Sequence, residues 1–146
     1  MVSKQDTNYN CGIFACMYYL KRYFHLKEDP RVLEIMANTT EENGTSHEGI
    51  YDIFNIILGF PLLNFKYNAS IKELASNLPA IINYQSDSGG HYAVVTDIDY
   101  NNDYMNIWNP ATGEHELIFD LEKWARENWY SKLYGMRWFL HIVSKE

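Results

Sequence analysis

A cysteine stands directly before a glycine, Cys11-Gly12, where the sequence predicts the start of an apolar helix over residues 11–26. Unpaired backbone N–H groups and the helix dipole stabilise a thiolate at such a position, and a basic neighbour lowers the pKa of the thiol further. Gln5 lies six residues upstream and could place its side-chain amide beside the backbone N–H of Cys11, which would give two donors for the oxyanion of an acyl-transfer intermediate. We therefore expect Cys11 to be a nucleophile and Gly12 to leave room for a substrate carbonyl.

The second cysteine, Cys16, has a different setting. It lies among Ile13, Met17 and Leu20 in the apolar stripe of the same predicted helix, so we expect a buried core thiol. The two cysteines are five residues apart, a step that turns an α-helix by about 500° and directs the thiols to different faces. Both thiols are expected to be free, which suits a reducing compartment.

A nucleophilic thiol needs a base, and His91 is the histidine best placed to supply one. It opens a predicted strand directly after Ser88, Gly89 and Gly90, a loop flexible enough to admit a substrate backbone, and it precedes the apolar run Tyr-Ala-Val-Val. We expect Gly89 and Gly90 to border the bound substrate. The other four histidines lie at helix ends or in later strands, where a solvated or structural role is more common: His25, His47, His115 and His141.

Asn109 could orient the histidine. The segment Trp108-Asn109-Pro110 ends a second predicted strand, which follows the His91 strand through a turn at residues 101–103. In an antiparallel pair the start of the first strand lies beside the end of the second, so His91 and Asn109 can be neighbours. A side-chain carbonyl at this place would accept the imidazole N–H and fix its tautomer, as the third member of a catalytic triad does. The alternative is an asparagine that only forms a turn before proline.

The elements around these residues change from helical to extended at Pro79. Before it, helices are predicted over residues 11–26 and 30–38, after Thr45 as far as Gly59, and after Ser70. After it, strands are predicted at residues 80–84, 91–98, 104–108, 116–119 and 137–143, and one helix interrupts them. The predicted N-caps are Asn10, Asp29, Thr45, Ser70 and Asp120. The fold class is therefore α+β, with N-terminal helices, of which the first is central and buried, packed on a C-terminal antiparallel β-sheet.

The composition places limits on the function. The chain has 146 residues, which fits one domain over residues 1–146, with 47% hydrophobic and 21% charged residues as in globular proteins. No apolar run approaches the ~18 residues that a membrane span needs, and the N-terminus lacks a signal-peptide pattern, so we expect no membrane span and a cytoplasmic location. The net charge of −7 contains no block of either sign, which argues against nucleic acid as a partner. We expect neither a metal nor a cofactor.

Together these features resemble the papain-like cysteine peptidases, and among them the bacteriocin double-glycine leader peptidases and their stand-alone relatives. The resemblance spans nearly the whole chain. It is carried by Gln5, Cys11-Gly12, Gly44-Thr45-Ser46, Leu78-Pro79-Ala80-Ile81-Ile82, His91-Tyr92-Ala93-Val94-Val95 and Asn109-Pro110. It implies a papain-like fold and a peptide or protein substrate.

The resemblance also implies a role for each candidate residue. Cys11 would correspond to the nucleophile, His91 to the base, Asn109 to the orienting group and Gln5 to the side-chain donor of the oxyanion hole. The leader peptidases usually carry aspartate in the orienting position, where this chain has Asn109, and aspartate before the cysteine, where it has Asn10. An amide orienting group also occurs in papain-like enzymes.

The expected chemistry begins with Cys11 held as a thiolate by His91, attacking a carbonyl group to form a thioester. Water as the acceptor gives peptide hydrolysis, which is our first expectation. An amine acceptor would give transpeptidation, a glutamine side chain as donor would give deamidation, and a silent peptide-binding domain of the same fold is a further alternative. Residues 10–16 also resemble the cysteine motif of proteases that remove small ubiquitin-like modifiers, but those carry histidine and aspartate before the glutamine, and only four residues precede Gln5.

Overall fold

The structure, a computed structural model, describes residues 2–87, 89–131 and 135–143. Three helices come first, and a sheet with two further helices follows. The helices are α1 (Cys11–Phe24), α2 (Pro30–Ala37), α3 (His47–Leu58), α4 (Ile71–Ala75) and α5 (Leu121–Asn128). The strands are β1 (Leu63–Tyr67), β2 (Ala80–Ser86), β3 (Gly89–Asp99), β4 (Tyr104–Asn109), β5 (Glu114–Phe119) and β6 (Trp138–Ile142).

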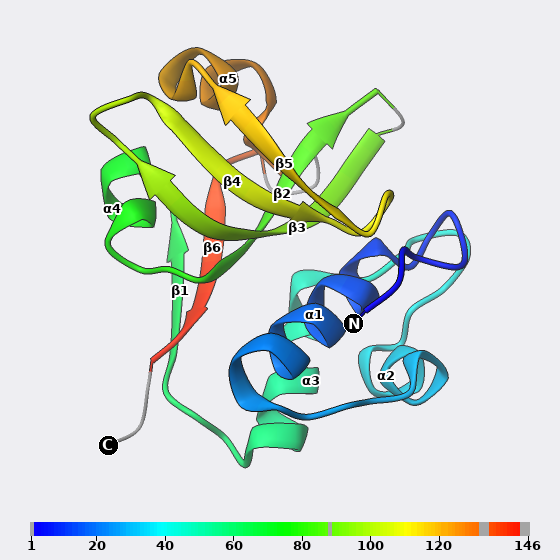
Figure 1. Cartoon of the computed structure of the whole chain (residues 1–146). Coiled ribbons are helices and arrows are strands. Elements are labelled where there is room, and N and C mark those ends of the chain that lie inside the picture. The colour runs from blue at the N-terminus through cyan, green and yellow to red at the C-terminus, as the bar shows by residue number, and fades with distance from the viewer. Residues whose placement is uncertain (1, 88, 132–134, 144–146) are drawn as a thin grey trace.

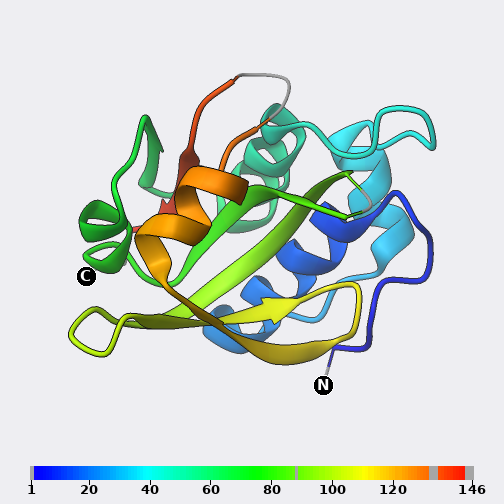
Figure 2. The ribbon, with the colours of Figure 1, turned by 90° about the horizontal axis from the view of Figure 1, so that it is seen from above.

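The strands form one antiparallel sheet in the order β1-β6-β2-β3-β4-β5. Helices α1, α2 and α3 lie together on one side of this sheet, and α5 lies on the other side (Figures 1 and 2). The expected α+β layout is confirmed, with the N-terminal helices packed on the sheet. Within the described residues, no helix combines the length and the apolar character that crossing a membrane requires.

Apolar side chains fill both sides of the sheet. On one side α1 is the central helix, because Ile13, Cys16 and Leu20 follow helical spacing and are completely buried against α3 and β3. On the other side α4 and α5 cover the sheet with a second cluster, which includes Leu74 and Leu121. The middle strands of the sheet are therefore buried on both faces. This packing fixes the positions of the start of β3 and the end of β4, which carry His91 and Asn109.

Several predicted helix ends are present in the structure. Asp29 caps α2 through its side chain, Ser70 and Glu73 form a capping box on α4, and Gly59 ends α3 in the left-handed conformation with φ 69°. These ends depend on local chemistry, so the sequence alone predicts them.

The predicted caps of α3 and α5 are wrong. Ser46, not Thr45, caps α3 with its side chain, because Thr45 is buried and faces the interior. Asp120 stands before α5, but its side chain makes no capping bond. The carboxylate of Asp103 accepts the N–H of Leu121 at 3.0 Å instead, so a residue distant in sequence supplies the cap.

The strand boundaries also differ from the prediction. β1 is an additional strand at one edge of the sheet, paired along its length with β6. Gly89 and Gly90, predicted in a flexible loop, are the first residues of β3, and Ser86 at the end of β2 pairs with Gly89; Ser88 lies outside the described residues. Gly89 has φ 108°, a conformation that glycine adopts without strain. The substrate-bordering loop expected at these glycines is therefore part of the sheet.

Candidate active site

Cys11 is the first residue of α1, and the helix begins there without a side-chain cap. Asn10 occupies the N-cap position, but its completely buried side chain turns away from the helix. It accepts a hydrogen bond from Thr7 N–H and donates to Asp6 and Glu34 at 2.8 and 3.0 Å. The predicted capping role of Asn10 is thus wrong, since the side chain instead ties the N-terminal segment to α2. The first N–H groups of α1 remain available beside Cys11.

The sulfur of Cys11 lies where the start of α1 meets β3. The residue is partly exposed, and burial raises the pKa of its thiol. Backbone hydrogen bonds, the strongest from Tyr92 and others from Gly12 and Cys11 itself, act in the opposite direction. Tyr92 follows His91 in β3, so the sulfur is in contact with the strand that carries the candidate base.

His91 is a buried residue near the start of β3, with 8% of its surface exposed. Its Nε2 lies 2.7 Å from Oδ1 of Asn109, the last residue of β4. Burial lowers the pKa of His91, while the hydrogen bond to Asn109 and the charge of Glu116 raise it. The expected approach of these two residues across the β3–β4 hairpin is present.

Tyr84 packs on His91 and lies near Cys11. It pairs with His91 across β2 and β3, and the two rings make an edge-to-face contact with centroids 5.5 Å apart. Burial raises the pKa of Tyr84, and the charges of Glu116 and Cys11 raise it further, so Cys11 lies within electrostatic reach of the phenol. Among the hydrogen bonds of the described residues, none joins the Cys11 sulfur to His91.

Glu116 is a residue of this site that the sequence analysis did not select. Its carboxylate accepts a hydrogen bond from Nδ2 of Asn109 at 2.8 Å and another from the Thr112 hydroxyl at 3.4 Å. A connected row of side chains therefore extends from His91 through Asn109 to Glu116. The sequence does contain an indication of this role, because Glu116 follows soon after the turn at Asn109. Its contact with Asn109, however, depends on the register of the β4–β5 hairpin.

Gln5 lies beside the end of β4. Its backbone N–H donates to the carbonyl of Pro110 at 2.7 Å, which fixes the N-terminal segment against the residue that follows Asn109. Its side-chain Nε2 donates to the carbonyl of Thr7 at 2.7 Å. Its Oε1 is buried and has no hydrogen-bond partner among the described residues. One of the two amide protons is thus committed to Thr7, and the other is the candidate donor.

The three glycines chosen from the sequence have different surroundings. A Cβ at Gly12 would lie 3.0 Å from the Tyr92 ring and 3.1 Å from Thr45, so a larger residue there would require these neighbours to shift. Gly90 lines a groove together with Cys11, whereas Gly89 is at the hairpin turn and does not line it. A substrate-binding role stays a prediction for all three.

The groove that contains Cys11 has a volume of about 710 Å³, within the range of ligand sites. The loop between α2 and α3 and the start of α3 form one wall, and residues of β2 and β3 form the other. Its size and its position at the candidate nucleophile would suit a peptide segment. Among the described residues, no group of three or more His, Cys, Asp and Glu side chains could hold a metal ion.

Solved structures of several peptidase domains share this fold. The first is a double glycine motif protease from an AMS/PCAT transporter in complex with the leader peptide, at 17% identity and TM-score 0.72, covering 99% of this chain and 91% of that chain. The second is the peptidase domain of Streptococcus ComA, a bi-functional ABC transporter involved in a quorum-sensing pathway, at 16% identity and TM-score 0.73, covering 99% and 100%. The third is the N-terminal peptidase C39-like domain of a toxin secretion ATP-binding protein from Vibrio parahaemolyticus, at 16% identity and TM-score 0.63, covering 93% and 98%.

Sequence comparison gives the family directly. Comparison with curated proteins produces no match. The model of the peptidase C39 family matches residues 1–123, a stretch that includes every candidate residue of the site. The resemblance to double-glycine leader peptidases is confirmed by this match, and the chain belongs to the peptidase C39 family.

Proposed function

We propose that the chain is a cysteine peptidase in which Cys11 is the nucleophile, His91 the base and Asn109 the group that orients the base. The observation that supports this most directly is the 2.7 Å hydrogen bond between His91 Nε2 and Asn109 Oδ1. A carbonyl oxygen only accepts, so Nε2 is assigned the ring proton and Nδ1 keeps its lone pair. Nδ1 is then the nitrogen that takes the proton of the thiol.

Glu116 supports this arrangement in two ways. It accepts from Nδ2 of Asn109, which fixes the amide with Oδ1 toward His91. Its negative charge also favours the protonated imidazole. The pair Asn109 and Glu116 would thus do together what a single aspartate does in the leader peptidases, orienting the ring and stabilising its positive charge.

The reaction has two halves. As the Cys11 sulfur attacks the substrate carbonyl, its proton passes to Nδ1 of His91, and a tetrahedral intermediate forms. The C–N bond then breaks, the leaving amine takes the proton from Nδ1, and a thioester remains on Cys11. Water attacks the thioester, again giving a proton to Nδ1, and the thiol is restored when the acid product leaves.

Two donors could stabilise the oxyanion. The N–H of Cys11 is at the uncapped start of α1, where backbone N–H groups and the helix dipole favour negative charge. The free amide proton of Gln5 would be the second donor. Each such donor contributes roughly 10²–10³-fold to turnover.

We expect neither Cys11 nor His91 to carry a charge before substrate binds. Burial raises the pKa of the Cys11 thiol and lowers that of His91, so both shifts favour the neutral forms. We therefore assign a neutral thiol and a neutral imidazole to the resting site. Proton transfer would accompany the attack rather than precede it.

Peptide cleavage tests the proposal. A protein of the same fold is named as a double glycine motif protease and was solved with the leader peptide, so peptides with a central Gly-Gly pair are the first substrates. Mass spectrometry of the products should show cleavage at the Gly-Gly pair. Cys11→Ala should abolish cleavage, and Cys16→Ala, which removes only the buried core thiol, should retain it.

The silent peptide-binding domain remains the second candidate. The same pKa shifts favour it, because burial opposes both charges of a thiolate–imidazolium pair. It predicts that peptides bind in the groove and are not cleaved, with equal affinity for the native protein and Cys11→Ala. Cleavage that depends on Cys11 excludes it.

A further inference from the structure

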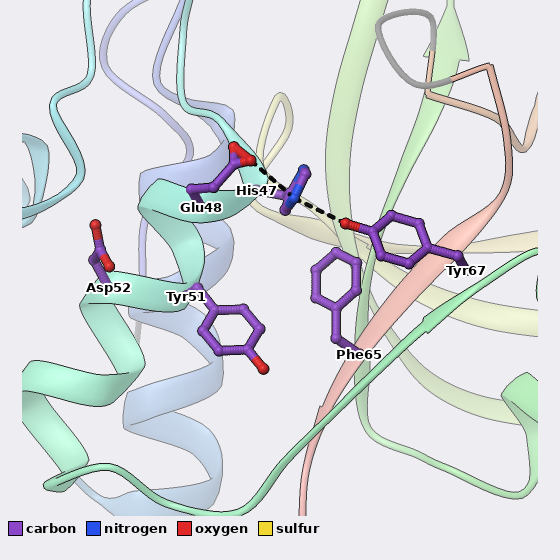
Figure 3. A pocket seen from close by; sticks show the side chains of 6 residues that line it. All are labelled: His47, Glu48, Tyr51, Asp52, Phe65 and Tyr67. Carbon is purple, nitrogen blue, oxygen red and sulfur yellow. Dashed lines mark hydrogen bonds and ion pairs between the residues drawn. The ribbon is translucent and has the colours of Figure 1, made fainter.

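A pocket of about 470 Å³ lies between the start of α3 and strand β1 (Figure 3). From α3 come His47, Glu48, Tyr51 and Asp52, and from β1 come Phe65 and Tyr67. Residues four apart on a helix share one face, which pairs His47 with Tyr51 and Glu48 with Asp52, and residues two apart on a strand also share a face. The pocket therefore combines aromatic rings with carboxylates.

The rings form a connected wall. Phe65 lies between two tyrosines, with its ring centroid 5.8 Å from that of Tyr51 and 4.8 Å from that of Tyr67. Figure 3 shows Phe65 and Tyr67 across the pocket from Glu48 and Asp52, whereas Tyr51 comes from the same helix as the two carboxylates. The hydroxyl of Tyr67 lies 3.0 Å from Nε2 of His47, which holds the Tyr67 ring in place.

The carboxylates give the pocket its charge. The Glu48 side chain is 62% exposed and lies 3.0 Å from His47, whose pKa is lowered by burial, so the histidine adds little positive charge at neutral pH. Asp52 is exposed and forms no hydrogen bond or ion pair with other described residues. A negative pocket lined by aromatic rings would attract a cation and repel an acidic group.

The pocket continues into the groove that contains Cys11. His47, Glu48 and Asp52 line both, and the groove adds Glu41 and Glu42 but no lysine or arginine among its described residues. The groove and the pocket together therefore present four carboxylates to a bound peptide: Glu41, Glu42, Glu48 and Asp52.

Trp138 lies at the junction of pocket and groove. It lines the groove, and its ring stacks on Phe65 with centroids 5.0 Å apart. Only 1% of Trp138 is exposed, and its indole N–H is buried with no hydrogen-bond partner among the described residues. Trp138 therefore links the groove to the aromatic wall through its packing on Phe65.

We propose that this pocket is a specificity subsite that binds a lysine or arginine side chain of the peptide whose scissile bond lies at Cys11. The cation would rest against the rings of Tyr51, Phe65 and Tyr67, with Asp52 and Glu48 as its charge partners. The role as a substrate subsite rests on the proposed peptidase function, while the binding of the cation does not. Peptides with a neutral or acidic residue in this place should be poorer ligands.

The binding test uses the Cys11→Ala protein and two small probes, Nα-acetyl-arginine methylamide and its citrulline analogue, which has the same shape without the charge. Backbone amide NMR spectra are followed through a titration with each probe. Arginine should shift the signals of α3 and β1 in a saturable way, with a Kd roughly 10-fold lower than that of citrulline. Equal affinities, or shifts confined to other elements, would overturn the proposal.

Variants assign the binding to the pocket. Asp52→Asn should raise the Kd for the arginine probe several-fold, and Glu127→Gln, which removes an exposed carboxylate from α5, should leave it unchanged. An Asp52→Asn protein that binds arginine as well as the parent contradicts the site. The probes are not cleaved, so the arginine-binding result does not depend on whether the chain is a peptidase. In the same way, a protein that fails to bind arginine could still cleave peptides.

Discussion

Glu116 accepts a hydrogen bond from the side-chain nitrogen of Asn109 at 2.8 Å, and this contact determines which way the Asn109 amide faces. A rotation of the amide by 180° would turn its carbonyl oxygen toward the carboxylate, where two acceptors would repel each other. With Nδ2 held by Glu116, Oδ1 faces His91. The tautomer of the candidate base therefore depends on a residue that does not touch it.

The first prediction is that Glu116→Gln lowers the pKa of His91. The negative charge of Glu116 raises this pKa in the native protein, so its removal must lower it. NMR titration of the His91 ring measures the shift without any substrate. Turnover per folded molecule should fall roughly 10-fold, or about 1.4 kcal/mol, near the lower limit for a hydrogen bond to a charged group.

A matched control for this experiment lies in the same strand. Glu114 is exposed and pairs with Asn109 across β4 and β5, so Glu114→Gln removes an equal charge without breaking the side-chain contact. Its His91 titration should match that of the parent protein. Equal effects of the two variants would mean that Glu116 acts only through the overall charge.

The second prediction exchanges the roles of Asn109 and Glu116. Asn109→Asp alone places two carboxylates in contact, and we expect it to destabilise the fold by roughly 1–3 kcal/mol, as when a hydrogen bond is lost and an unpaired buried group remains. The double variant Asn109→Asp with Glu116→Gln restores one amide and one carboxylate, and should recover most of that loss. Urea unfolding of both single variants and the double variant gives the coupling energy. Additive effects would contradict a direct contact.

The position of the candidate nucleophile can be predicted from sequence because local features determine it. The apolar spacing after Cys11 defines the helix, and the cysteine is simply its first residue. The closeness of His91 and Asn109 is also predictable, since an antiparallel hairpin brings the start of one strand to the end of the other. Neither inference requires knowledge of distant contacts.

Other parts of the site depend on contacts that a sequence does not display. Glu116 reaches Asn109 only in the register that the β4–β5 hairpin adopts, and a shift of one residue would turn its side chain to the other face. Strand β1 has five residues, too few for an alternation of apolar and polar residues that would predict a strand. Its partner β6 lies more than 70 residues away in the sequence. Asn10 fails as a cap because Asp6 and Glu34 compete for its side chain.

The third prediction is selective alkylation. Cys11 is partly exposed, whereas Cys16 is completely buried and burial raises the pKa of its thiol strongly. A limiting dose of iodoacetamide should label only Cys11, because its thiol is the accessible one, and mass spectrometry of peptides locates the label. His91→Ala should slow this labelling, since the thiol loses its proton acceptor. Equal labelling of both cysteines in the folded protein would remove the support for a nucleophile.

The fourth prediction concerns stability against pH. Burial lowers the pKa of His91 in the folded protein, so between the folded and unfolded pKa values the unfolded chain binds more protons. The free energy of unfolding should therefore decrease as the pH falls through about 6.5, the ordinary histidine pKa, and regain its full value above it. His91→Gln should weaken this dependence, measured by urea unfolding at a series of pH values. His25→Asn is the control, because His25 is exposed and asparagine tolerates its left-handed conformation with φ 58°.

The fifth prediction tests Gln5 as the side-chain donor of the oxyanion hole. One amide proton is held by the carbonyl of Thr7 at 2.7 Å, and the backbone of Gln5 is fixed to Pro110 at 2.7 Å, so the second proton has a defined direction. If it points to the oxyanion, Gln5→Ala should lower turnover by roughly 10²–10³-fold with little change in substrate affinity. Gln5→Glu should be at least as damaging, since a carboxylate would repel the developing negative charge.

A purely structural role for Gln5 predicts a different result. The bond to Thr7 then only stabilises the approach to α1, and Gln5→Ala should cost about 1 kcal/mol of stability while the rate per folded molecule is preserved. The acceptor on Thr7 is a backbone carbonyl, which a substitution of Thr7 does not remove. The melting temperature and the turnover of each Gln5 variant are therefore measured together. The Oε1 of Gln5 is buried and has no hydrogen-bond partner among the described residues. Because an unpaired buried acceptor destabilises the fold, its removal in Gln5→Ala should offset part of the stability loss. Full activity in a well-folded Gln5→Ala protein would leave the backbone N–H groups at the start of α1 as the only oxyanion donors.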